Sequence, residues 1–391
     1  MKVVYFAQDL ADPAVHRRIR MLREGFDEIV LLGFRRSAAP VGLVEGVPTI
    51  DLGRTISAQL IHRTGCVLAV AATLHRYRTH IVGAHVVMGR NLEMLVLAAL
   101  ARRRYAPSAS LVFECLDIHW TMTTRSPFGA AIRQIEGRLL RQCDLLMVSA
   151  PDYITRYFQV MHKRLPPVWV AENKMLEAEV AADLPVAGTL PSGPPWRIGM
   201  FCQMRCRESV LLLAKLAARL PEQVHVVLQG SVATEIFPDF HQLIRGKRGI
   251  EYRGPYDRRV DLPGMYADVH FVWAIDFYGA HGNSDKLLPN RLYEALAYGV
   301  IPIADQSVAT GRWLERFRTG VRLTDPFLDQ ATRFFADLDA TAFDRLRATA
   351  AVLPRSAYIS SAEECRQMCA SMTSSFARSR VGTSRPLRRI V

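Results

Sequence analysis

The sequence lacks any long apolar run without charge. No stretch of 18 apolar residues is free of charged side chains, so we expect no membrane-spanning helix. Met1–Asp9 reads as a strand and turns polar too early for a signal peptide. No repeat of 20–50 residues is present, which disfavours solenoid architectures. These absences favour a cytoplasmic protein built from ordinary globular domains.

Cysteine is scarce as well. The seven cysteines in 391 residues are odd in number and scattered, which does not fit the disulfide framework of a secreted domain. Most of them stand among apolar residues, so we expect reduced thiols inside protein cores. Cys202 and Cys206 are four residues apart, as are Cys365 and Cys369. Because no further Cys or His completes either pair, a zinc site is disfavoured.

Motifs of several common enzyme classes are also absent. The chain has no Walker loop, no Gly-x-Ser-x-Gly, no protein-kinase motif set and no His-Glu-x-x-His, which disfavours the enzymes that depend on them. The loop after the strand-like run at Trp196 lacks the glycines of a dinucleotide fingerprint, so a Rossmann dehydrogenase is disfavoured. No RRM, KH or helix-turn-helix signature appears, so we expect no nucleic-acid partner.

Positive charge, in contrast, is abundant and unevenly placed. The chain has 50 Lys+Arg and 37 Asp+Glu, a formal net charge of +13. Residues 1–165 hold 22 basic against 13 acidic residues (+9), and residues 166–391 hold 28 against 24 (+4). This asymmetry indicates an anionic partner for the first half, such as an anionic membrane surface or a phosphorylated lipid. A merely solvated basic face is the alternative.

Short apolar runs alternate with helical patterns in two successive sets. The strand-like runs are Val3–Ala7, Glu28–Gly33, Ile81–Met88, Leu111–Cys115, Leu145–Ser149 and Val168–Ala171, then Trp196–Cys202, Val224–Gln229, Val269–Trp273 and Val300–Ala304. Alternation of strands and helices predicts parallel sheets covered on both faces. We therefore predict an α/β fold with two Rossmann-like, doubly wound domains facing a central cleft, where ligands bind beyond the carboxyl ends of strands.

Composition sets the expected domain boundaries. We place an N-terminal domain at 1–182, a Pro- and Gly-rich linker at 183–195, a C-terminal domain at 196–373 and a basic, disordered tail at 374–391. The last helix before the tail could pack back on the N-terminal domain. Residues 56–78 give a helical pattern with an apolar centre and basic ends, which fits either an interfacial helix or a core helix of the first domain.

The most informative stretch runs from Asn283 to Gly299. A polar loop meets Pro289, which suits the first turn of a helix, and Gly299 ends that helix before a short buried strand. The helix start offers backbone N–H groups and the positive end of the helix dipole to a diphosphate. Asn290 and Glu294 share a face, so a carboxylate there could bind both ribose hydroxyls. A nucleotide-sugar site is predicted; an ordinary helix start with an exposed Glu is the alternative.

Other polar residues follow strand-like runs and could line the cleft. Asp117 and His119 come after the run that ends at Cys115, where a carboxylate could take the proton of an incoming hydroxyl and a His could assist it. A capping Asp and a packed His are the alternative. Glu172 and Lys174 also follow a run.

In each half of the chain, a pair of basic residues follows the first strand. Asp12 is a good N-cap, and His16 and Arg17 then lie in the first turn of its helix, where an anionic substrate could reach them. Arg205 and Arg207 follow the first strand of the second half and could grip a diphosphate with paired donors.

Seven motifs occur in a fixed order along residues 1–350. They are Asp9–Arg18, Glu114–His119, Glu172–Lys174, Arg205–Arg207, Gly254–Tyr256, Trp273–Asp276 and Asn283–Glu294. In this set the chain resembles the ExoL-type glycosyltransferases of bacterial exopolysaccharide (succinoglycan) assembly; Leu-Asp-Ile-His and Leu-Pro-Asn-Arg-Leu-Tyr-Glu are its specific strings. The resemblance implies the glycosyltransferase-B (GT-B) fold, a UDP-sugar donor on the second domain, a polyprenyl-diphosphate-linked acceptor on the first, and no metal or other cofactor.

The motifs also give the expected roles. We expect the donor at Arg205, Arg207, Asn283, Ser284, Lys286, Asn290, Arg291, Tyr293 and Glu294, the acceptor at Asp12, His16, Arg17, Glu172 and Lys174, and catalysis at Asp117 and His119. One position departs from the family pattern. Retaining members of the broad family have two Glu separated by seven residues, and here Lys286 replaces the first. This favours inverting transfer with Asp117 as the base, the leaving diphosphate being stabilised by a helix dipole and basic side chains.

We therefore expect a hexosyltransferase. It would move a hexose such as glucose or glucuronate from a UDP-sugar to a lipid-linked oligosaccharide in exopolysaccharide biosynthesis. It would be peripheral on the inner face of the cytoplasmic membrane, with the anionic membrane surface as a partner. Two alternatives stay open: a nucleotide-sugar epimerase on the same fold, which would not explain the basic first domain, and a non-catalytic scaffold of the polysaccharide machinery.

Overall fold

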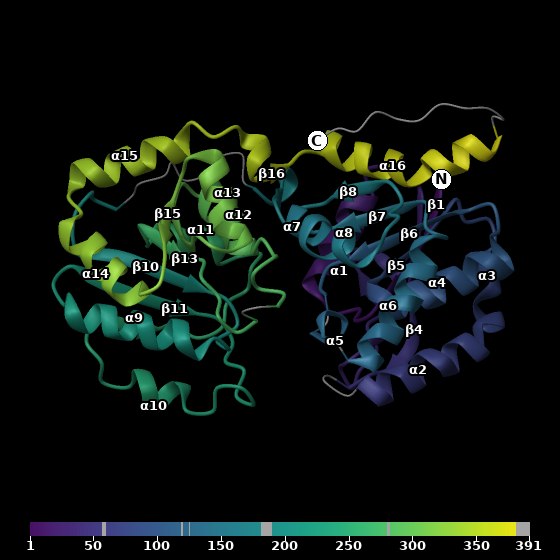
Figure 1. Ribbon diagram of the computed structural model, residues 1–391, viewed down its shortest axis with the longest axis horizontal. Coiled ribbons are helices and arrows are strands. Elements are labelled where there is room, and N and C mark those ends of the chain that lie inside the picture. Colours follow the sequence, from purple (N-terminus) through teal and green to yellow (C-terminus); the bar gives the residue numbers. More distant parts are fainter. Residues whose placement is uncertain (57–59, 119, 125, 181–189, 280–281, 381–391) are drawn as a thin grey trace. The chain divides into compact units, whose positions relative to one another are not determined.

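The chain forms two compact units, each built on a parallel sheet (Figure 1). Unit 1 comprises Met1–Ala171 and Ala362–Val391, and unit 2 comprises Glu172–Ser361. The computed structural model describes the chain outside residues 57–59, 119, 125, 181–189, 280–281 and 381–391. Among the described residues, no helix combines the length and the apolar character needed to cross a bilayer.

The sheet of unit 1 has eight strands in the order β3-β4-β2-β1-β5-β6-β7-β8. They are β1 (Lys2–Ala7), β2 (Glu28–Arg35), β3 (Leu43–Val44), β4 (Val47–Arg54), β5 (Val86–Arg90), β6 (Ser110–Cys115), β7 (Leu145–Val148) and β8 (Val168–Val170). All neighbours pair in parallel except β3 with β4. The central strands are continuous apolar runs because helices cover both faces; Val3–Ala7 is fully buried.

The helices of unit 1 pack around this sheet. They are α1 (Pro13–Leu22), α2 (Leu60–Ala72), η1 (Leu74–Tyr77), α3 (Arg78–Ile81), α4 (Asn91–Tyr105), α5 (Trp120–Thr123), α6 (Pro127–Leu140), α7 (Pro151–Tyr153), η2 (Ile154–Phe158), α8 (Gln159–Met161) and α16 (Ala362–Arg380). Helix α1 starts where the sequence predicts, because the Asp12 side chain accepts a hydrogen bond from Ala14 N and Pro13 occupies the first turn.

Unit 2 has a six-stranded, fully parallel sheet in the order β12-β11-β10-β13-β14-β15. Its strands are β10 (Trp196–Phe201), β11 (Val224–Gln229), β12 (Ile250–Tyr252), β13 (Phe271–Trp273), β14 (Ile301–Asp305) and β15 (Val321–Leu323). A separate two-stranded sheet pairs β9 (Met175–Leu176) with β16 (Ile359–Ser360). The core is aromatic: Trp196 and Trp273 are fully buried, and the Phe271 ring contacts those of Phe335 and Phe343 edge-on.

The helices of unit 2 cover this sheet. They are η3 (Glu177–Glu179), α9 (Arg207–Arg219), α10 (Phe240–Ile244), α11 (Leu262–Ala267), α12 (Asn290–Ala297), α13 (Ala309–Phe317), α14 (Phe327–Asp337), α15 (Ala340–Ala351) and η4 (Arg355–Ala357). The predicted α/β fold with two parallel sheets is therefore confirmed.

Several boundaries differ from those expected from the sequence. The strand expected at Ile81–Met88 starts only at Val86, because Ile81 ends α3 and Gly83, at φ +79°, turns the chain. Strands β3, β4, β9, β12, β15 and β16 have no counterpart in the prediction. The first segment of unit 1 ends at Ala171, before the boundary expected at residue 182, and its second segment begins at Ala362, within the range expected for the C-terminal domain. Most of the linker expected at 183–195 lies outside the described residues.

Helix α16 belongs to unit 1 and packs on α1. Its buried residues Cys365, Met368, Cys369 and Met372 share one face, and Met368 Sδ lies 3.0 Å from the Arg18 guanidinium. The helix extends to Arg380, past the tail boundary expected at residue 374, since residues 374–380 contain no Gly or Pro to end it. The rest of the expected tail, 381–391, lies outside the described residues.

The contact between α16 and the end of α1 depends on Gly25. A Cβ atom at this position would lie 2.4 Å from the Cβ of Cys369, which is held by its own helix. We expect Gly25→Ala to lower the free energy of unfolding by about 1–3 kcal/mol, as overpacked sites do. Gly42→Ala is the control, because an added Cβ there meets nothing within 4 Å. Urea unfolding of both variants checks this, and an unchanged midpoint for Gly25→Ala would contradict it.

Candidate functional site

Unit 2 has a small pocket at the carboxyl ends of β13 and β14. It is lined by Ala274, Ile275, Asp276, Phe277, Ser284, Asp285, Leu287, Pro289, Asp305, Val308 and Thr310. In a parallel α/β sheet this is the edge where ligands bind. The loop between β13 and α12, which carries the most informative sequence motif, forms most of the lining.

Asp276 organises this loop. Its Oδ1 accepts a hydrogen bond from Tyr278 N (3.0 Å), and its Oδ2 accepts one from Ser284 Oγ (3.5 Å). Gly279 N in turn donates to Ser284 Oγ (3.1 Å). Arg205, from the loop after β10, lies with Nη2 3.6 Å from Asp276 Oδ2 and with its guanidinium over the Tyr278 ring. The structure thus brings together two predicted residues, Arg205 and Ser284, around an Asp that the prediction did not assign to the site.

Arg207 does not join them. It is the first residue of α9, where it pairs with the exposed Asp239 and stacks on Phe237. Its guanidinium is thus held by partners outside the loop of Asp276. The paired arginine grip by Arg205 and Arg207 therefore stays a prediction.

Helix α12 begins at Asn290 directly after Pro289, as its sequence predicts. Asn290 is exposed. The buried Arg291 donates from Nη2 to the carbonyl oxygens of Ala274 (3.4 Å) and Ile275 (3.3 Å), which ties the helix to the end of β13. The hydrogen bonds of Arg291 thus fix the start of α12 beside the pocket.

The other predicted donor residues have protein partners as well. Lys286 Nζ donates to Gly282 O (2.6 Å), and the carbonyl of Asn283 accepts from the backbone N–H of Lys286. Tyr293 is fully buried, and its hydroxyl donates to Glu172 Oε2 (3.1 Å). Tyr293 therefore packs inside unit 2.

Glu294 is buried, with 2% of its surface exposed, so the alternative of an exposed Glu is wrong. Arg258 Nε donates to its Oε1 (2.8 Å) and the Tyr266 hydroxyl donates to its Oε2 (2.9 Å). Arg258 also pairs with Glu179 (3.4 Å). Because this carboxylate is buried, a ribose could reach it only if neighbouring side chains move.

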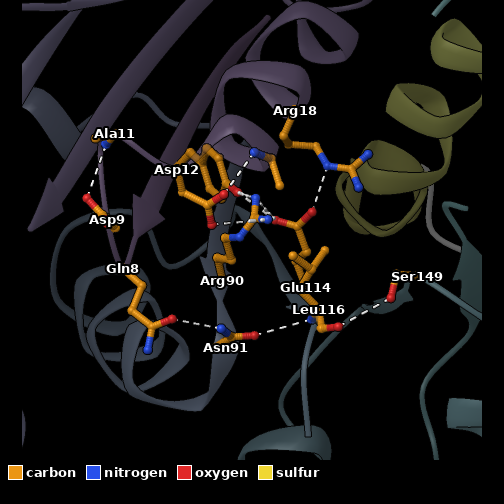
Figure 2. Close-up of polar contacts among 12 residues, drawn as sticks. Gln8, Asp9, Ala11, Asp12, Arg18, Arg90, Asn91, Glu114, Leu116 and Ser149 are labelled. Carbon is orange, nitrogen blue, oxygen red and sulfur yellow. Dashed lines mark hydrogen bonds and ion pairs between the residues drawn. The ribbon is translucent and has the colours of Figure 1, made fainter. Parts of the chain in front are cut away.

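Unit 1 places a buried charge cluster at the carboxyl ends of β1, β5 and β6 (Figure 2). Glu114 accepts hydrogen bonds from Arg18 Nε (2.7 Å) and the Tyr5 hydroxyl (2.6 Å). Arg90 Nη1 donates to the Tyr5 oxygen (3.0 Å) and lies 3.7 Å from Glu114. Burial raises the pKa of Glu114, but the charges and hydrogen bonds of Arg18, Arg90 and Tyr5 outweigh it, so this pKa lies below its usual value.

The cluster is joined to the loops around it (Figure 2). Arg90 Nη2 points to the α1 N-cap, 3.8 Å from Asp12 Oδ2. Asn91, at φ +63°, donates from Nδ2 to Gln8 Oε1 (2.8 Å) and accepts from Leu116 N (3.2 Å). Since these contacts tie together the loops after β1, β5 and β6, the cluster fixes the carboxyl edge of the sheet.

Some of the predicted catalytic and acceptor residues lie near this edge of the sheet. Asp117 lies two residues after the end of β6 and is exposed, while His119 lies outside the described residues. His16 Nδ1 contacts Glu45 Oε1 (3.0 Å). Arg17 is 8% exposed in unit 1, and its expected role toward an anionic substrate stays a prediction.

Two predicted acceptor residues fall in the other unit. Glu172 and Lys174 belong to unit 2, where Glu172 accepts from Tyr293 and the following strand β9 pairs with β16. Their assignment to the first domain is therefore wrong, because the chain enters unit 2 as soon as β8 ends.

Sequence reasoning missed Arg90 and Glu114 as a pair. The available signal was a charged residue at the end of each of two apolar runs, Val86–Gly89 and Leu111–Phe113. A charge in such a place is costly unless it has a partner.

Comparison with known proteins supplies the family. No family model matches the chain. The succinoglycan biosynthesis protein ExoL of Rhizobium meliloti (strain 1021) is 38% identical over 317 residues, covering 80% of this chain and 79% of that protein. The chain belongs to the family of the succinoglycan biosynthesis protein ExoL. The family expected from the sequence is thus confirmed.

Solved structures of GT-B enzymes share the fold of this ExoL-family chain. Anabaena HepE in complex with UDP has a TM-score of 0.64 at 16% identity, covering 96% of this chain and 100% of that one. Sucrose-phosphate synthase of Thermosynechococcus elongatus has a TM-score of 0.69 at 14% identity (97% and 100%). A trehalose 6-phosphate synthase of Burkholderia multivorans has 0.65 at 11% (100% and 99%).

The described residues of this ExoL-family chain contain no candidate metal-binding site. No three Asp, Glu, His or Cys side chains there are placed to hold a metal ion.

The Glu114 cluster makes a testable contribution to stability. Glu114→Gln keeps the shape but removes the carboxylate that pairs with Arg18 and leaves Arg90 only the more distant Asp12, so we expect the free energy of unfolding to fall by about 3–5 kcal/mol at pH 7. Because the folded pKa of Glu114 lies below its unfolded value of about 4.3, this contribution is present above that value and is lost as pH falls through the folded pKa. The difference in the free energy of unfolding between wild type and Glu114→Gln should therefore become smaller at low pH.

Chemical unfolding at pH 7 and at pH 4 measures both effects. Glu28→Gln is the control, since Glu28 pairs with Lys2 at the surface of the same unit, and it should change stability little. A Glu114→Gln protein as stable as wild type at pH 7 would contradict the account of the cluster.

Proposed function

We propose that this protein transfers a hexose from a UDP-sugar to a lipid-linked oligosaccharide in exopolysaccharide biosynthesis. The observation that carries the proposal is its membership of the ExoL family, since the relative is named for succinoglycan biosynthesis. HepE, which has the same fold, is captured with UDP and with UDP-glucose. In this proposal unit 2 holds the donor and unit 1 the acceptor.

The donor diphosphate would lie at the loop of unit 2 that Asp276 organises. Arg205 supplies a fork of N–H donors there, Lys286 a second cation, and Asn290 the start of α12. Carboxylates of Asp276 and Asp305 are among the pocket residues. The hexose would be glucose or glucuronate.

The ribose would bind Glu294. In this proposal Arg258 releases Oε1 of the carboxylate, which then accepts hydrogen bonds from the ribose hydroxyls. Arg258 keeps a partner in Glu179 when it moves, because it already contacts that carboxylate. Hydrogen bonds to a charged acceptor are worth about 1.5–3 kcal/mol each, enough to offset the loss of one such contact.

Transfer would proceed with inversion. The acceptor hydroxyl oxygen attacks the anomeric carbon, the bond from that carbon to the UDP oxygen breaks, and Asp117 takes the hydroxyl proton. The exposed position of Asp117, two residues after the end of β6, supports this role. Charge that develops on the leaving UDP would be stabilised by Arg205 and Lys286.

Binding of UDP tests the donor site. UDP well above its Kd should raise the Tm of the wild type by several degrees. Glu294→Gln, which keeps the size of the side chain, should lose most of this shift because it removes the charged acceptor. Arg258→Gln is the matched control, since it breaks the same pair from the other side. An equal loss in both variants would show that the pair only supports the fold.

Turnover tests the proposed base. Asp117→Asn keeps the shape and removes the basicity, so kcat should fall at least about a hundredfold while the UDP-induced Tm shift stays near wild type. Steady-state kinetics with the preferred donor measures this. Near-normal turnover would exclude Asp117 as base, and a product whose anomeric configuration matches the donor would exclude inversion.

A donor screen tests the reaction itself. Purified protein is mixed with membranes that bear lipid-linked acceptor and with a panel of labelled UDP-sugars. Label that enters the lipid fraction supports the transferase. An epimerase would convert the UDP-sugar without any acceptor, and a scaffold would bind UDP and do neither.

A further inference from the structure

Residues 52–113 of unit 1 have an unusual charge composition. They contain eight arginines, no lysine and one acidic residue, Glu93. Glu93 forms an ion pair with Arg63, which joins α2 to the first turn of α4. The one negative charge of the segment is therefore already matched within it.

The helices of this segment lie side by side. Helix α2 contacts α4, η1 follows α2, and α3 contacts α4; Figure 1 shows α2, α3 and α4 together. Arg104, near the end of α4, donates from Nη1 to Ala71 O (3.4 Å) at the end of α2. This contact places the arginines of the α4 C-terminus beside the C-terminal end of α2.

The outer side of α2 is uncharged. Residues 64–74 carry no charged side chain. Leu68 is 63% exposed, and Gly65, Ala69 and Ala72 are exposed with it. A helix face turned to water normally carries polar and charged residues, so this face is suited to a less polar environment.

Exposed cations surround the end of that face. They are Arg76 and Arg78, which follow α2, and Arg103 and Arg104 at the end of α4. We call the uncharged face of α2 together with these four arginines the basic rim surface. It combines exposed apolar side chains with positive charge. Because the only acidic residue of the segment, Glu93, pairs with Arg63, it does not neutralise these four arginines.

We propose that the basic rim surface docks on the surface of an anionic lipid membrane. Cationic side chains gain from the negative potential of anionic headgroups, and an apolar helix face gains from contact with the acyl boundary. A nucleic acid would bind the arginines but would gain nothing from the exposed Leu68. The surface therefore fits a lipid membrane better than a nucleic acid. The proposal deepens the proposed function, because a lipid-linked acceptor would be met at such a surface.

Co-sedimentation with vesicles tests the proposal on the full chain. Wild-type protein should bind phosphatidylglycerol vesicles and leave phosphatidylcholine vesicles unbound. Arg76→Gln/Arg78→Gln should weaken binding about 25-fold, at about fivefold per arginine. Leu68→Gln should weaken it about tenfold without any change of charge.

Matched controls lie in unit 2. Arg245→Gln/Arg248→Gln removes two exposed arginines, and Val260→Gln removes an apolar side chain that is 72% exposed. Both should bind vesicles as wild type does. A third variant, Arg385→Gln/Arg388→Gln/Arg389→Gln, tests the C-terminal arginines as the rival source of binding.

The outcomes separate cleanly. Loss confined to the rim variants supports the proposal. Equal loss in the unit 2 controls, loss only in the C-terminal variant, equal binding to neutral vesicles, or tighter binding to RNA than to anionic vesicles would overturn it. The UDP-induced Tm shift, measured on the same proteins, reports on the proposed function separately: it should be intact in every rim variant, and its absence in wild type would count against the donor site alone.

Discussion

In each unit the structure depends on hydrogen bonds and charges that offset the cost of burying one carboxylate. Glu114 in unit 1 and Glu294 in unit 2 are almost completely buried, and each accepts hydrogen bonds from one arginine and one tyrosine. Taking a carboxylate out of water costs several kcal/mol unless such partners are present. The sequence must therefore supply the partners from distant segments, which connects each site to the fold around it.

The consequence for function is that loops which could meet ligands are fixed in advance. In unit 1, Asn91 and Arg90 tie the ends of neighbouring strands to one another, and Asp117 lies two residues after the end of β6. In unit 2, Asp276 and Arg291 hold the loop and helix that line the pocket. Preorganised polar groups are what a transferase needs to stabilise a leaving diphosphate without rearranging during the reaction.

Much of the architecture could be predicted from the sequence, because buried parallel strands are apolar runs. Strands such as β4 were missed since Pro48, Asp51 and Gly53 interrupt the apolar pattern. The spacing around Pro289 gave the start of α12, which depends on local chemistry. The Arg258 partner of Glu294 could not be found in this way, because it lies 36 residues away and meets Glu294 only in the folded chain.

The central claim is that unit 2 binds a uridine nucleotide and that Glu294 accepts hydrogen bonds from its ribose. Calorimetric titration with UDP and with 2′,3′-dideoxy-UDP tests it most directly, because the two ligands differ only in the ribose hydroxyls. The account predicts that UDP binds and that the dideoxy compound binds about 10–100-fold more weakly, as loss of hydrogen bonds to a charged group requires. Equal affinity for the two ligands would contradict it.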